Sequence, residues 1–179
     1  MRPVQLLNGT ERETYPVDQT TLANHYTEWC MDFITRNRDQ PFFLHYAPTA
    51  PHKPLSVSPA FDGKTGAGLY ADTVVELDAS VGTLLEQLRT TGLAENTLVL
   101  FTSDHGPWYG GSTGGLRGMK ASTFEGGFRV PMLAWWPGKL AAGQEIATPA
   151  ITMDLFTTAI QAATIPLPSD RVIDGCDLM

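Results

Sequence analysis

The stretch TLVLFTSDHG, residues 97–106, decides the fold prediction for this chain. Its first six residues are apolar at nearly every position, which is typical of a strand buried on both faces in a parallel sheet. The run then stops abruptly at Ser103, Asp104, His105 and Gly106. Polar residues directly after a strand lie beyond its carboxyl end, where ligands gather in open α/β sheets. The stretch therefore predicts a sheet strand and, at its end, a candidate site.

Helix and strand patterns alternate on both sides of this stretch. Apolar residues at helical spacing predict three helices, over residues 21–36, 70–88 and 154–163. Short apolar runs predict two more strands, PFFLHY at 41–46 and VPMLAWW at 130–136. This order of elements is typical of an α/β fold. We expect one domain over residues 1–179, with an irregular lead-in at 1–19 and a tail at 166–179.

Composition narrows the class of protein. The chain has 179 residues, of which 42% are hydrophobic and 17% charged, so disorder is excluded as its main state. The net charge is −7 and no basic stripe is present, so nucleic acid is not an expected partner. The longest apolar stretch, Val130 to Trp136, is far shorter than the roughly 20 residues of a membrane-spanning helix. The two cysteines make neither a disulfide framework nor a metal knuckle.

Three loops at strand ends carry residues that are suited to ligand binding or catalysis. Asp104 and His105 offer a carboxylate oxygen and an imidazole nitrogen, which suit a divalent cation; a simple strand-end turn, in which His105 has no task, also explains them. His52 lies in the proline-stiffened loop 47–54, where it would serve as a general acid or as a surface residue without a task. Lys120 lies in a glycine-rich loop and supplies a point charge for an anion, although the Walker pattern is absent.

These groups together suit an anionic ester such as a sulfate or phosphate ester. A cation polarises the oxygens, Lys120 neutralises charge, and His52 protonates the leaving oxygen. His45, within the predicted strand 41–46, is interpreted as a packed or partnered sheet residue. Glu125 and Arg129 are four residues apart, which predicts an ion pair that supports the structure.

Four segments, in order, resemble the type I sulfatases of the alkaline-phosphatase-like superfamily. They are PFFLHYAPTAPHKPL from Pro41, YADTVVELDASVG from Tyr70, NTLVLFTSDHG from Asn96, and the lysine segment from Gly115 to Pro131. The resemblance covers about residues 14–165. It implies a partial alkaline-phosphatase-like sandwich, with a mostly parallel or mixed sheet flanked by helices.

The resemblance also implies roles for individual residues. Asp104 and His105 match ligands of a divalent cation, usually calcium; many family members have Asn at the second position. His52 matches a histidine near the sulfate that acts on the leaving oxygen, and Lys120 matches a lysine that holds the sulfate. The implied activity is hydrolysis of sulfate esters, on small molecules or glycans.

One family segment is absent from this sequence. Family members carry a nucleophile as Cys or Ser followed by x-Pro-x-Arg, and this residue becomes formylglycine. Neither Cys30 nor Cys176 is followed by that pattern, nor are Ser56 and Ser58. The paired aspartates that complete the cation site are absent too. We therefore expect the chain to be part of a sulfatase catalytic domain, inactive alone, with an incomplete sheet edge prone to self-association.

Two other functions stay open at this point. One is a phosphodiesterase or phosphonate monoester hydrolase of the same superfamily, and the other is a non-catalytic sulfatase remnant. The particular ester is undefined, although Trp108 and Tyr109 suit stacking on a sugar or aryl group as well as covering a core edge. Many bacterial members are periplasmic, so export is one expectation for a parent protein.

Overall fold

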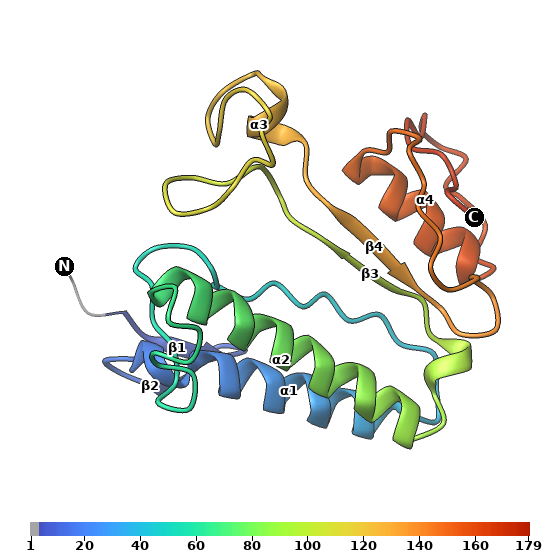
Figure 1. Cartoon of the computed structure of the whole chain (residues 1–179). Coiled ribbons are helices and arrows are strands. Elements are labelled where there is room, and N and C mark those ends of the chain that lie inside the picture. Colours follow the sequence, from blue (N-terminus) through green and yellow to red (C-terminus); the bar gives the residue numbers. More distant parts are fainter. Residues whose placement is uncertain (1–3) are drawn as a thin grey trace. The chain divides into compact units, whose positions relative to one another are not determined.

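The computed structural model describes residues 4–179 (Figure 1). Its contacts divide the chain into two compact units, one up to Thr91 and the other from Gly92 onward. The first unit is built on two long helices, and the second on a two-stranded sheet, a glycine-rich loop, one short helix and one longer helix. The expectation of one domain stays a prediction.

The first unit opens with a hairpin where an irregular lead-in was expected. Strand β1 (Leu6–Asn8) pairs antiparallel with β2 (Glu11–Thr14). The turn begins at Gly9, whose φ of 61° is a conformation that glycine adopts without a steric cost. Asn-Gly followed by a second short strand is a strong hairpin signal. The expectation for residues 4–19 was therefore wrong at this hairpin.

Two of the predicted helices form the body of this unit. Helix α1 (Leu22–Asn37), preceded by the 3-10 turn η1 (Gln19–Thr21), lies alongside α2 (Leu69–Thr90) (Figure 1). The Gln87 amide of α2 donates to the backbone oxygen of Met31 on α1 at 2.8 Å. Both helix predictions are confirmed in position and length.

The buried face of α2 differs from the apolar face that its sequence predicts. Asp72 and Glu76 are buried, whereas Val74 of the predicted face is exposed. The two carboxylates accept hydrogen bonds from the loop before the helix: Ser58 N donates to Glu76 at 3.1 Å, and Thr65 N donates to Asp72 at 2.8 Å. Paired in this way, buried carboxylates avoid the cost of lost hydration.

The predicted strand at residues 41–46 is not a strand in the structure. Its exposure alternates along the chain as an extended segment would, and both Phe43 and His45 face outward. No strand of residues 4–179 pairs with it, and a strand is defined by its ladder of inter-strand hydrogen bonds. The interpretation of His45 as a packed residue is therefore wrong.

The second unit contains the predicted strands 97–102 and 130–136. Strand β3 (Val99–Thr102) follows the turn η2 (Ala94–Asn96) and pairs with β4 (Met132–Trp135). The pairing is antiparallel, and β3 is half-buried rather than covered on both faces. The pairing with β4 is therefore not the parallel one that the apolar run of residues 97–102 had predicted. No third strand joins this pair within residues 4–179, and self-association through its edges stays a prediction.

Helix α4 (Thr152–Ala162) confirms the last predicted helix and holds the tail. Asp154 is buried and accepts from the backbone N–H of Ile151 at 2.8 Å and of Cys176 at 2.9 Å. Thr158 accepts from the N–H of Leu178 at 3.0 Å. One carboxylate thus caps the helix and fastens the tail to it.

Three buried glycines, Gly106, Gly126 and Gly127, form what we call the glycine cluster. Gly126 and Gly127 belong to the short helix α3 (Glu125–Phe128). Gly106 N donates to Gly127 O at 2.9 Å. A Cβ on Gly106 would overlap the carbonyl oxygen of Gly126, and a Cβ on Gly126 would overlap that of Gly118. The loop after β3 therefore packs backbone against backbone.

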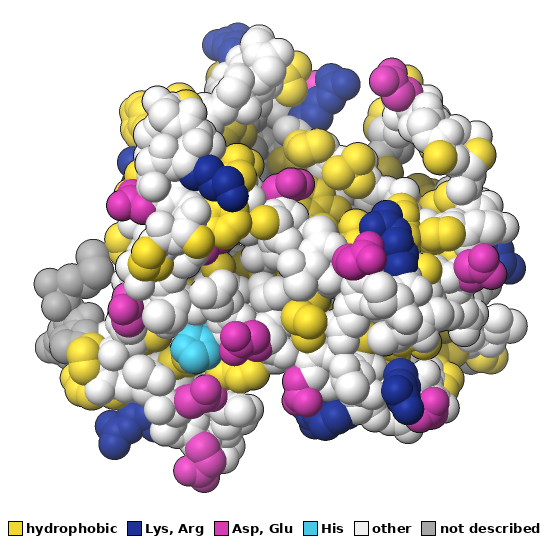
Figure 2. All heavy atoms as spheres, turned by 60° about the horizontal axis from the view of Figure 1, so that its bottom comes forward, with side chains coloured by type: hydrophobic (Ala, Val, Ile, Leu, Met, Phe, Trp, Pro, Cys, Tyr) yellow, Lys and Arg dark blue, Asp and Glu magenta, His cyan; other side chains and the backbone are white. Residues whose placement is uncertain are grey.

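The surface agrees with the composition. Acidic and basic side chains are interspersed over the face in Figure 2, with no basic stripe across it. Within the described residues, every helix is too short or too polar to cross a bilayer.

The second unit should be less stable in acid, because the carboxylate of Asp154 becomes protonated there. Hydrogen bonds from the N–H groups of Ile151 and Cys176 lower the pKa of Asp154. The carboxylate therefore stabilises the fold above the ordinary aspartate pKa of about 3.9, and this contribution is lost as pH falls through the lower folded pKa. The free energy of unfolding, measured with urea between about pH 5 and pH 2, should fall less steeply with pH in Asp154→Asn than in the wild type. The variant Asp174→Asn, at an exposed aspartate of the tail, should keep the wild-type slope; equal slopes for all three proteins would contradict the prediction.

Adding one methyl group to the glycine cluster should lower the stability of the protein. We expect Gly126→Ala to lower the free energy of unfolding by about 1 to 3 kcal/mol, because the new Cβ forces the backbone of residues 117–118 away. Gly82→Ala is the matched control, since Gly82 lies in α2 and a Cβ added there would meet no atom within 4 Å. That change should raise stability by up to about 1 kcal/mol. Similar denaturation curves for the two variants would contradict the close approach.

Candidate functional site

Asp104 and His105 lie directly after β3 and contact each other. The Asp104 carboxylate is 3.0 Å from His105 Nε2, and its side chain is 80% exposed. His105 Nδ1 is 2.9 Å from the backbone oxygen of Gly106. A carbonyl oxygen can only accept a hydrogen bond, so this contact places a proton on Nδ1, and Nε2 is the ring nitrogen that is available to a cation. That nitrogen and the carboxylate thus face the same point.

This arrangement fits two ligands of a divalent cation. A backbone carbonyl that orients the far nitrogen of an imidazole is the usual support of a metal-bound histidine. The Ser103 hydroxyl donates to the His105 carbonyl at 3.1 Å and steadies the turn. Residues 4–179 gather no group of three His, Cys, Asp or Glu side chains around one point. Calcium takes six to eight oxygen ligands, so this pair is a fraction of such a site.

Lys120 is held beside the same loop by its backbone. Its N–H donates to the carbonyl of Pro107 at 2.8 Å, and its side chain is half-buried. The Gly106–Gly127 hydrogen bond of the glycine cluster ties the two ends of this region together. Arg129 pairs with Glu125 at 3.0 Å, which confirms the predicted structural ion pair. The segment with Asp104 and His105 and the segment with Lys120 therefore form one packed structure.

His52 lies in the first unit, on the loop between α1 and α2. Its backbone N–H donates to Thr49 O at 2.9 Å, and its ring Nδ1 lies 2.8 Å from Lys53 O. A contact of Nδ1 with a carbonyl again favours a proton on Nδ1, this time on an exposed side chain. His52 belongs to a different unit from the other three residues, so its approach to them stays a prediction.

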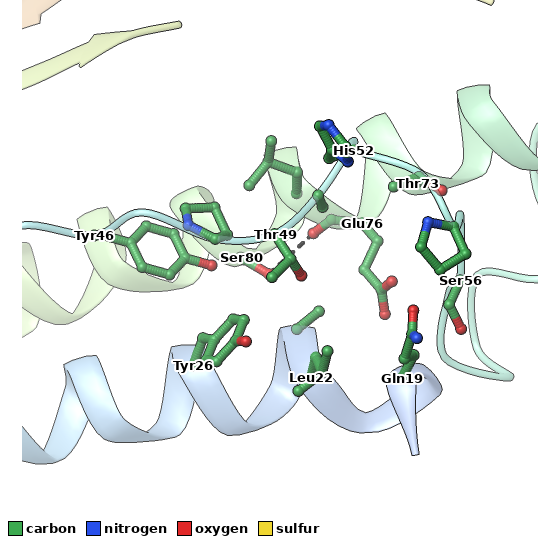
Figure 3. A pocket seen from close by; sticks show the side chains of 15 residues that line it. Gln19, Leu22, Tyr26, Tyr46, Thr49, His52, Ser56, Thr73, Glu76 and Ser80 are labelled. Atoms are coloured by element: carbon green, nitrogen blue, oxygen red, sulfur yellow. Dashed lines mark hydrogen bonds between the residues drawn. The ribbon is translucent and has the colours of Figure 1, made fainter. Parts of the chain in front are cut away.

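A small polar cavity lies behind His52 in the first unit (Figure 3). Its volume is about 30 Å³, and the loop 46–56 closes it over α1 and α2. The Glu76 carboxylate extends across it toward Gln19 and Ser56 (Figure 3). Burial at the cavity raises the pKa of Tyr46. This volume holds a water molecule, whereas ligand pockets are typically several hundred Å³, so the cavity is not a substrate pocket.

Two exposed aromatic side chains follow the candidate cation ligands. Trp108 is 45% exposed and Tyr109 is 64% exposed, and their rings meet edge to face at 4.9 Å. They start at the residue after Pro107, whose carbonyl accepts from Lys120. Stacking on a sugar or aryl group stays a prediction.

Sequence reasoning found the candidate residues but missed what holds them. Asp104 and His105 are brought into contact, and Lys120 is tied to the same loop, as the residues in the two segments had suggested. The packing of Gly106 against α3 and the φ of 70° at Ala121 were not predicted. The density of glycines in residues 106–127 was the available signal, since close backbone approach requires them.

Comparison with known proteins gives the family. The sulfatase family model matches residues 5–165. The chain is 45% identical to N-acetylgalactosamine-6-sulfatase of Mus musculus over 183 aligned positions, which cover 96% of this chain and 35% of that protein. It is 44% identical to steryl-sulfatase of Rattus norvegicus, covering 92% of this chain and 30% of that protein. The chain thus spans about a third of the length of these relatives.

Solved structures agree with this result. The PsFucS1 sulfatase from Pseudoalteromonas sp. superposes with a TM-score of 0.85 at 32% identity, over 94% of this chain and 36% of that one. The structure of Ps i-CgsB in complex with k-i-k-neocarrahexaose gives 0.83 at 31% identity, over 94% and 40%. A partial alkaline-phosphatase-like fold accounts for the helices and strands described above. The chain belongs to the sulfatase family.

Proposed function

We propose that this chain is the part of a sulfuric ester hydrolase that carries the sulfate-binding lysine and part of a cation site. The observation that carries the proposal is the backbone hydrogen bond between Lys120 and Pro107, three residues after Asp104. It supports a site in which a cation and an ammonium group face one anionic ester. The names of the relatives favour sulfate over phosphate.

Lys120 and His52 have complementary tasks in this proposal. The Lys120 ammonium neutralises the charge of the sulfate and of the leaving oxygen, because a point charge in a half-buried loop acts strongly on an anion. In this role His52 starts as an imidazolium: it gives its Nε2 proton to the leaving alkoxide and keeps its Nδ1 proton directed at Lys53 O. This task requires His52 to approach Lys120 in the complete catalytic domain.

Asp104 and His105 hold the cation through Oδ2 and Nε2. When bound, a calcium ion would polarise the sulfate oxygens. Two ligands are too few for calcium, so the remaining ligands come from other parts of the catalytic domain. The contact between His105 Nδ1 and the Gly106 carbonyl keeps Nε2 directed toward the ion.

Neither thiol of this chain is suited to be the nucleophile. Cys30 is buried in α1, and burial raises its pKa. The hydrogen bond between the Cys176 thiol and Asp154 raises the pKa of Cys176 as well. A thiolate is the reactive form, so both remain poor nucleophiles near neutral pH. The expected formylglycine therefore belongs outside these positions, and we expect no turnover of 4-methylumbelliferyl sulfate by the 179-residue chain.

Sulfate should bind at Lys120. The chain has four lysines, so labelling with [6-¹³C]lysine gives four resonances. We expect the Lys120 resonance to shift on titration with sodium sulfate and the signal of binding to disappear in Lys120→Ala, because the ammonium supplies the charge.

Lys139→Ala serves as the control for this titration. Lys139 lies in the same unit with its ammonium 5.5 Å from the Trp136 ring centre, and its loss should leave the Lys120 response unchanged. A response of all four lysines of equal size would indicate screening by salt and would contradict a site at Lys120.

Cation binding at Asp104 and His105 should be weak and local. We expect calcium to bind with a dissociation constant above about 1 mM, since most ligands are missing. Manganese reports such weak sites by broadening nearby amide signals. Signals of residues 103–106 should broaden first in the wild type and not in Asp104→Ala, while Asp174→Ala behaves as the wild type does. Broadening centred elsewhere would refute the ligand pair.

A further inference from the structure

The residue after Lys120 has an uncommon backbone conformation. Ala121 has a φ of 70°, in the left-handed region that favours glycine. Its side chain is a methyl group, which makes no hydrogen bond to compensate, as Asn or Asp would. Strain of this kind persists only where the surroundings enforce it, and it is concentrated at functional sites.

The surroundings of Ala121 define the turn that it occupies. Ser122 N donates to Met119 O at 3.0 Å, which closes a four-residue turn with Lys120 and Ala121 at its centre. Met119 N in turn donates to the Ser122 hydroxyl at 3.2 Å. A positive φ at the third position is the mark of a type II turn, where glycine or asparagine is usual. We call residues 119–122 the lysine turn.

The lysine turn is fixed to the candidate site from two directions. Lys120 N donates to Pro107 O at 2.8 Å, which ties the turn to the loop after His105. A Cβ on Gly127 would overlap the carbonyl oxygen of Ser122, so the turn also packs directly on the glycine cluster. These contacts hold the residues on both sides of Ala121 in place.

We infer that Ala121 is a positioning residue, whose left-handed backbone keeps the lysine turn in its type II form and so holds Lys120 in its place beside the loop after His105. This inference rests on the proposed role of Lys120 in sulfate binding. The negative φ that ordinary residues prefer at this position would convert the turn to type I. That conversion reverses the peptide between Lys120 and Ala121, so the Lys120 carbonyl and the Ala121 N–H exchange faces of the turn beside the ammonium-bearing residue.

The test compares substitutions of Ala121 by residues that adopt the left-handed region readily with substitutions by residues that do not. Ala121→Gly and Ala121→Asn accept it, so both should raise the melting temperature and keep the wild-type sulfate affinity at Lys120. Ala121→Val rejects it because its branched side chain clashes there, and sulfate affinity should fall about tenfold, the loss of one charge-assisted contact. Where the valine variant does not fold, Ala121→Leu replaces it. Affinity is read from the [6-¹³C]lysine titration of the full chain, and folding from the amide spectrum.

The possible results separate the two proposals. If wild-type sulfate binding does not depend on Lys120, the proposed function fails before Ala121 is considered. If it does depend on Lys120 and the folded Val or Leu variant binds as the wild type does, the positioning role is overturned and Ala121 is purely structural. Equal loss of affinity in the Asn and Val variants also overturns it, because the methyl group rather than the backbone would then matter.

Discussion

The hydrogen bond from the Lys120 amide to the Pro107 carbonyl joins the two segments that carry the candidate cation ligands and the anion-binding lysine. It forms only because Gly106, Gly126 and Gly127 let the chain after β3 pack against α3 without intervening side chains. Lys120 and Asp104 are 16 positions apart in sequence. Their association therefore depends on a missing atom at each of three residues rather than on an attractive side-chain contact.

Buried carboxylates hold loops to helices in both units. Asp72 and Glu76 fasten the loop 58–65 to α2, and Asp154 fastens the tail to α4. In each case a buried carboxylate accepts backbone N–H groups, which is stronger than a bond between neutral groups and needs no cationic partner. Buried acidic residues thus hold a loop in the first unit and the tail in the second.

Much of this structure was predictable from sequence, and the failures have physical causes. Helices α1, α2 and α4 follow from their periodicity, and β3 and β4 from their apolar runs. The buried face of α2 was missed because Asp72 and Glu76 are polar by type, and only the loop that they bind makes their burial favourable. Residues 41–46 have a strand's composition, but pairing depends on a partner that composition does not reveal.

The candidate site was also predicted only in part from the sequence. The identities of Asp104, His105 and Lys120 are local in sequence and were found there. The turn at Ala121 was not, because alanine gives no sign of a left-handed backbone. His52 was selected by its position in a stiff loop, and its partner residues depend on how the complete catalytic domain assembles.

Residues 108–116 lie between two carbonyls, of Pro107 and Arg117, that are fixed by backbone hydrogen bonds, and they are less constrained than these two residues. Pro107 is bonded to Lys120 and Arg117 to Gly126, so residues 108–116 leave and rejoin the packed structure at fixed points. Because the entropic cost of closing a loop grows only slowly with its length, insertions and replacements in this excursion would leave the spacing of the anchors intact. The length and composition of residues 108–116 can therefore change without moving Lys120, because the backbone bonds of Pro107 and Arg117 lie outside this excursion.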